Sequence, residues 1–154
     1  MEKFRIDNFL EAEPGKVFPY FESVPPDVCR ELKARLAQKL KLRRESDALI
    51  VLEAAVSKVQ VLEGLSAEDR LFDLQGVLRR VSAVQPHDFV YINWDRFEHI
   101  DRMRVADLSQ HFFYIWYSGP DDIELFDDNL SWLMSIHHSG TVSVGRLEPW
   151  TMSR

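Results

Sequence analysis

The sequence predicts an α+β fold, in which an N-terminal layer of three main helices packs on a C-terminal, mostly antiparallel sheet of four to five strands. Apolar residues recur at helical spacing up to about residue 83, and after Pro86 the pattern changes to short strand-like segments bounded by turn residues. No βαβ alternation and no internal repeat accompanies this order. No polar or flexible linker occurs at Pro86, so we expect a single domain over 1–154.

The first half of the chain is typical of helices. We expect a short helix at about 2–11, followed by a loop rich in aromatic residues and proline. The helix over 26–43 begins at two prolines, which suit a first helical turn, and its apolar stripe consists of Val28, Leu32, Leu36 and Leu40. A second, apolar helix is expected over 46–63 and a third over 66–83, because Gly64 separates them and Ser66 can cap the third.

The second half is typical of strands. A short helix near 103–111 interrupts them, within a charged stretch that otherwise predicts a loop. Ser139-Gly140 is a two-residue hairpin signal between the last two strands. The expected strands are 88–93, 113–117, 122–126, 131–138 and 141–145.

The composition excludes several classes of protein. A single cysteine, Cys29, can form neither an intramolecular disulfide nor a cysteine-rich zinc site, and we interpret it as an inert, partly buried thiol. No apolar run approaches the ~20 residues that a membrane-spanning helix needs, and the N-terminus lacks the apolar run of a signal peptide. We therefore expect a cytoplasmic protein without a membrane partner.

Charge is distributed unevenly along the chain, whose formal net charge is −6. Residues 30–44 contain seven basic side chains and one acidic one. Residues 105–145 contain no lysine or arginine and carry six acidic side chains, which are Asp107, Asp121, Asp122, Glu124, Asp127 and Asp128. Such asymmetry bears on association with other molecules rather than on the fold.

The acidic stretch provides the candidate partner-binding residues. Two aspartate pairs flank the strand expected at 122–126, and aromatic side chains precede it. Acidic groups at the rim of a surface accelerate encounter with a basic protein, and aromatic anchors hold the complex. The predicted binding residues are Asp121, Asp122, Asp127, Asp128, Trp116 and Tyr117.

No motif for a metal, a cofactor or nucleophilic catalysis is evident, so we expect none of these groups. His137 and His138 are adjacent on an expected strand, where neighbouring side chains point to opposite faces, and this argues against chelation of one ion. The basic helix lacks interleaved aromatic residues for base stacking, and the chain is acidic overall. Nucleic acid is therefore a minor alternative as a partner.

Two further hypotheses remain open. The charged segment 96–104 contains an acid–base pair, His99 and Glu98, with Arg96 and Arg102 nearby, and such groups can act on a phosphodiester. The basic helix of one copy can also meet the acidic stretch of another, which predicts a salt-sensitive homo-oligomer.

The C-terminal third resembles a segment of small bacterial α+β proteins, some of which are similar to immunity proteins that neutralise toxins of interbacterial competition. The resemblance rests on Ile115-Trp116-Tyr117, Asp121-Asp122-Ile123, Phe126-Asp127, Ser131-Trp132 and His138-x-Gly140. It implies a cytoplasmic, non-enzymatic, acidic binder. Our leading hypothesis is therefore a non-catalytic bacterial protein that occludes a basic toxin by steric and electrostatic means.

Overall fold

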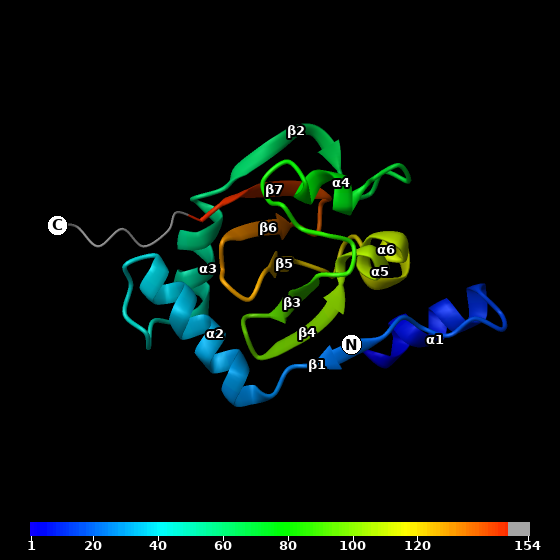
Figure 1. The fold of residues 1–154 in the computed structure, drawn as a ribbon, viewed down its shortest axis with the longest axis horizontal. Helices are drawn as coiled ribbons and strands as arrows, with labels where there is room; N and C mark the ends of the chain where they lie inside the picture. The colour runs from blue at the N-terminus through cyan, green and yellow to red at the C-terminus, as the bar shows by residue number, and fades with distance from the viewer. Residues whose placement is uncertain (148–154) are drawn as a thin grey trace.

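A computed structural model describes residues 1–147 of the chain, and over this range the fold is α+β. Six helices accompany one sheet of seven strands, in the order β1-β4-β3-β5-β6-β7-β2, and every neighbouring pair is antiparallel (Figure 1). The predicted fold class is confirmed. The sheet is larger than the four to five strands expected, and the helices are not all N-terminal.

The helices and strands alternate along the chain more than the sequence predicted. The helices are α1 (Lys3–Ala12), α2 (Pro26–Lys39), α3 (Ala48–Val56), α4 (Leu74–Leu78), α5 (Val105–Gln110) and α6 (Phe112–Ile115). The strands are β1 (Phe21–Ser23), β2 (Gln60–Ser66), β3 (Phe89–Asp95), β4 (His99–Arg104), β5 (Ile123–Phe126), β6 (Trp132–Ile136) and β7 (Thr141–Arg146).

The helix expected over 46–63 is wrong in its second half. Asp47 caps α3 by accepting a hydrogen bond from the backbone N–H of Leu49, but the helix ends at Val56. The chain then enters β2, whose Val61 is opposite Ser143 of β7. Pairing with a distant strand outweighs the local helical pattern here. Of the helix expected over 66–83, only α4 forms.

The strand expected over 113–117 is also wrong, since its first three residues belong to α6 and the last two to neither a helix nor a strand. Phe112 and Ile115 are both buried, and a short apolar run of this kind does not distinguish a strand from a buried helix. The charged segment expected as a loop instead forms β4. Its side chains alternate between the two faces, and it pairs with both β1 and β3.

Two apolar cores cover the two faces of the sheet. On β6, Met134 belongs to the core that contains residues of α4, α5 and α6, whereas Leu133 belongs to the core beneath α2 and α3. Figure 1 shows α2 and α3 close together at the left of the view, and α4, α5 and α6 at the right. Side chains of one strand therefore reach two separate layers, as strand alternation requires.

Helix α1 packs against α6 at one side of the molecule. Its Phe9 is buried and makes edge-on aromatic contacts with Phe18, His111 and Tyr114.

Within residues 1–147 no helix has the length and apolar character needed to cross a membrane.

Candidate functional site

Asp121 is part of the interior rather than of an outer surface. Its side chain is only 8% exposed and accepts two hydrogen bonds from Arg5 of α1, at 2.6 Å from Nη1 and 2.9 Å from Nη2. Arg5 is itself 2% exposed and also donates to the carbonyl of Ile115 at 2.6 Å. This bidentate pair joins α1 to the chain after α6, so Asp121 is not available to attract a partner.

The remaining three aspartates lie at opposite ends of β5. Asp122 precedes the strand and is exposed, whereas Asp127 and Asp128 follow it in the turn to β6. A strand of four residues spans about 13 Å. The expectation that these carboxylates form one outward-facing region is therefore wrong, because strand geometry separates them and burial removes Asp121.

The acidic turn after β5 meets the basic helix of the same molecule. Arg35 of α2 donates to the carbonyl oxygen of Asp128 at 2.7 Å, and Lys39 donates to that of Leu130 at 2.5 Å. These contacts use backbone carbonyl groups rather than the carboxylates of the turn. The carboxylate of Asp127 accepts from the backbone N–H of Ser131 at 2.7 Å and from its hydroxyl group, which holds the turn in place.

The two aromatic residues predicted as anchors differ in exposure. Trp116 is 4% exposed, stacks on Phe112 at 5.6 Å, and donates its indole N–H to the carbonyl of Asp121 at 3.0 Å. It is a core residue, because the segment that precedes it forms a buried helix. Tyr117 is half-buried beside Phe4, with the ring centroids 5.5 Å apart, so part of its ring remains accessible.

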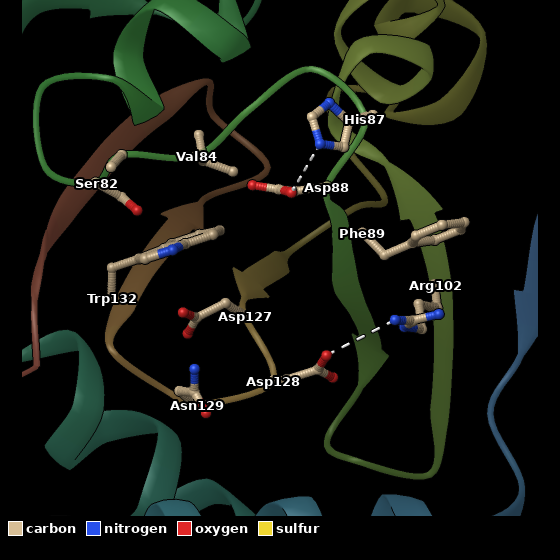
Figure 2. Close-up of a pocket in the computed structure, with 11 residues that line it drawn as sticks. Ser82, Val84, His87, Asp88, Phe89, Arg102, Asp127, Asp128, Asn129 and Trp132 are labelled. Carbon is tan, nitrogen blue, oxygen red and sulfur yellow. Dashed lines mark ion pairs between the residues drawn. The ribbon is translucent and has the colours of Figure 1, made fainter.

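A hollow of about 480 Å³ lies between the loop that precedes β3 and the turn after β5 (Figure 2). We call it the acidic pocket, because Asp88, Asp127 and Asp128 line it. Figure 2 shows the three aspartates among the lining residues, with Trp132 at the left and Arg102 at the right. Two of the four predicted aspartates therefore line one pocket, together with an acidic residue that the sequence analysis did not single out.

The pocket carries a surplus of negative charge. Its one lysine or arginine among the described lining residues is Arg102, whose Nη2 lies 3.7 Å from Oδ2 of Asp128. The Arg102 guanidinium also lies 4.4 Å from the centre of the Phe89 ring. Burial, followed by the neighbouring Asp128 carboxylate, raises the pKa of Tyr91 to about 12, so this phenol stays protonated at neutral pH beside the pocket.

Two of the residues considered for phosphodiester chemistry, His99 and Arg102, do not come together. Strand alternation places Arg102 on the face of β4 opposite to His99 and Asp101. Asp101 is buried and accepts a hydrogen bond from the indole N–H of Trp94 at 2.8 Å. His99 and Arg102, expected in one site, thus lie on different sides of the sheet, and Arg96 and Glu98 lie in the turn between β3 and β4.

The two adjacent histidines lie together, contrary to expectation. β6 ends at Ile136, so His137 and His138 belong to the turn before β7, and their ring centroids are 3.8 Å apart. His138 Nδ1 lies 2.9 Å from Oδ1 of Asp122. The alternation rule applies only within a strand, and the Ser139-Gly140 turn signal already placed the strand end close by.

Comparisons with protein-family models, with curated proteins and with solved structures found no match to this chain. The function must therefore be argued from the residues themselves. Two groupings of side chains in the described part of the chain are suited to binding a cation. They are the acidic pocket and a second cluster, formed by Asp122, His137 and His138, which we call the histidine turn.

Proposed function

We propose that this chain is a non-catalytic bacterial protein that binds another protein, and that its acidic pocket receives a basic side chain of that partner. The observation that carries the proposal is the composition of the pocket. Three carboxylates and one guanidinium surround a hollow large enough for a side chain, with Phe89 and Trp132 in its walls. Of the six residues predicted to bind a partner, Asp127 and Asp128 are the ones that this proposal uses.

The chemistry of the pocket favours a cationic guest. Carboxylates bind guanidinium and ammonium groups through charge-assisted hydrogen bonds, and aromatic faces attract the same cations. Arg102 already illustrates this within the molecule, because it lies between Asp128 and the Phe89 ring. At 3.7 Å its contact with Asp128 is loose, which leaves the carboxylate able to accept a second donor.

The other two hypotheses, phosphodiester chemistry and self-association, are less well supported. A phosphodiester entering the acidic pocket would meet three carboxylates, which repel phosphate. Self-association through the basic helix is less favoured, since Arg35 and Lys39 already contact the acidic turn within one molecule. A protein partner with an exposed arginine or lysine fits the pocket better than either.

The nature of the partner follows from the resemblance of the C-terminal third to the toxin-immunity type. On that basis we propose a basic toxin as the partner and a cytoplasmic location for the complex. Binding would neutralise the toxin by covering its basic surface. Asp122 and Tyr117, which remain accessible beyond the other end of β5, lie outside the pocket and are not needed for this mechanism.

Titration with short peptides tests the pocket. An arginine-rich peptide, added to the isotope-labelled chain, should shift backbone amide signals of 82–89 and 127–132 in an NMR spectrum, and a glutamate-rich peptide should not. The double variant Asp88→Asn with Asp128→Asn removes two charges from the pocket and should weaken binding at least about tenfold. The control Glu53→Gln with Glu63→Gln removes the same charge from exposed positions elsewhere.

The outcome of the control decides the interpretation. Equal weakening by both double variants would mean that the net charge of the chain attracts the peptide, and the pocket proposal would fail. Co-expression with the product of the adjacent gene tests the toxin hypothesis separately. Protection by the wild-type chain, and its loss in the pocket variant alone, is the expected result.

A further inference from the structure

The histidine turn gathers three metal-binding side chains from two segments that are distant in the sequence. His138 Nδ1 lies 2.9 Å from Asp122 Oδ1, and His137 Nε2 lies 3.9 Å from the same oxygen. One ligand atom from each of the three residues lies within 4.8 Å of the other two. All three side chains are exposed, so an ion can reach them from solvent.

These separations match the coordination sphere of a small ion. Zinc binds imidazole nitrogen and carboxylate oxygen at about 2.0–2.2 Å, so two ligands of a tetrahedral ion are about 3.4 Å apart. The distances of 2.9 Å and 3.9 Å lie on either side of that value. Side-chain shifts of about half an ångström would bring each of these two imidazole nitrogens to that spacing from Asp122 Oδ1.

The hydrogen bonds around the cluster orient the ligands. His137 Nδ1 lies 2.7 Å from the hydroxyl oxygen of Ser139 and accepts a hydrogen bond from the backbone N–H of Ser139 at 3.2 Å, and these two contacts hold the ring with Nε2 on the side of Asp122. Zinc binding through Nε2 would move the proton to Nδ1, where the Ser139 hydroxyl group can accept its hydrogen bond. The backbone N–H of His138 donates to Asp122 Oδ1 at 2.7 Å and holds the carboxylate next to the rings. Outer partners of this kind fix the orientation and tautomer of metal ligands.

The backbone at the histidine turn is tightly constrained. Gly140 has φ +92°, and a Cβ atom there would lie 2.5 Å from the hydroxyl oxygen of Ser66. The backbone N–H of Gly119 donates to the carbonyl of His138 at 2.9 Å, which joins the turn to the loop that leads to Asp122. Both segments are therefore held in position before any ion binds, and this lowers the entropic cost of coordination.

We propose that Asp122, His137 and His138 form a binding site for Zn²⁺. The donor set of two imidazoles and one carboxylate suits zinc, whereas magnesium and calcium prefer oxygen ligands. Three ligands from the protein leave the fourth tetrahedral position open to water or to a donor from another molecule. This site is independent of the acidic pocket, and either proposal can fail without the other.

Calorimetric titration of Zn²⁺ into the full chain, free of any affinity tag and stripped with EDTA, tests the site. We expect one ion per chain, and a thermal melt should move to higher temperature when Zn²⁺ is added. His137→Ala, His138→Ala and Asp122→Asn should each weaken binding at least about tenfold, and Ser139→Ala should weaken it about tenfold through loss of orientation.

A matched control comes from a second exposed histidine–aspartate pair. His87 Nε2 lies 3.8 Å from Asp88 Oδ1, so His87→Ala removes a histidine beside an aspartate without touching the histidine turn. This variant should bind Zn²⁺ like the wild type. Absence of binding to the wild type, or equal binding by the wild type and His138→Ala, would overturn the proposal. Melts of the metal-free variants will show whether each one is folded, so that lost binding can be assigned to the missing ligand.

Discussion

Replacing Glu124 with glutamine tests the electrostatics of the buried sheet. Glu124 lies in β5 and is 8% exposed, and its Oε1 accepts a hydrogen bond from Asn93 Nδ2 at 3.2 Å. Within residues 1–147 no lysine or arginine forms an ion pair with it. Burial, with a further contribution from the charge of Asp122, raises the pKa of Glu124 to about 8.

The expected change in the free energy of unfolding follows from the difference between this pKa and the ordinary value of 4.5. At about 1.4 kcal/mol for each pH unit, the difference amounts to about 5 kcal/mol. The folded chain keeps a proton on Glu124 that the unfolded chain releases above pH 4.5. The free energy of unfolding should therefore decrease as the pH rises from 4.5 to about 8, and Glu124 should destabilise the fold most above that pH.

Urea denaturation of the wild type and of Glu124→Gln between pH 4.5 and 9, with EDTA present, measures this effect. The two proteins should have similar stability at pH 4.5, and the variant should be more stable by several kcal/mol at pH 9. Glu63→Gln, at an exposed position of β2, serves as the control and should show no such trend. A constant difference between Glu124→Gln and the wild type over the whole range would refute the reasoning.

Three further substitutions or reactions address individual contacts. Asp121→Asn leaves the buried charge of Arg5 without its carboxylate and should lower the free energy of unfolding by about 3–5 kcal/mol in urea; a loss below about 1 kcal/mol would contradict this. Gly140→Ala combines a positive φ with a clash and should cost about 1–3 kcal/mol, more than Gly15→Ala, where φ is also positive but no atom lies within 4 Å. Burial raises the pKa of the Cys29 thiol, which is 1% exposed, so Ellman's reagent should modify it only after unfolding; equal rates in buffer and in urea would disprove this.

Helices and strands that depend on residues close together in the chain could be predicted from the sequence. The two prolines and the spacing of the leucines predict α2, which begins at Pro26 and ends at Lys39, four residues before the expected end. The apolar segment that begins at Ile123 forms a strand, as predicted. The fold class could be predicted for the same reason, because helical and strand periodicities are properties of short windows of sequence.

The candidate sites could not be predicted in the same way, because each joins segments far apart in the chain. Asp88, Arg102 and Asp128 meet in one pocket only through the pairing of β3 with β4 and β5. Asp122 meets His138 because β5 pairs with β6, and a shift of one residue would turn the side chains of a strand to the other face.

The sequence by itself determined the α+β class, the helix that begins at Pro26, the Ser139-Gly140 turn between the last two strands and the uneven distribution of charge. Only the tertiary structure decided that 60–66 joins the sheet, that Asp121 is buried against Arg5, and that His137 and His138 lie together. The physical reason is that local propensities differ by about 1 kcal/mol or less per residue. Burial of apolar side chains and pairing with a distant strand contribute more than that, so long-range packing decides wherever the two conflict.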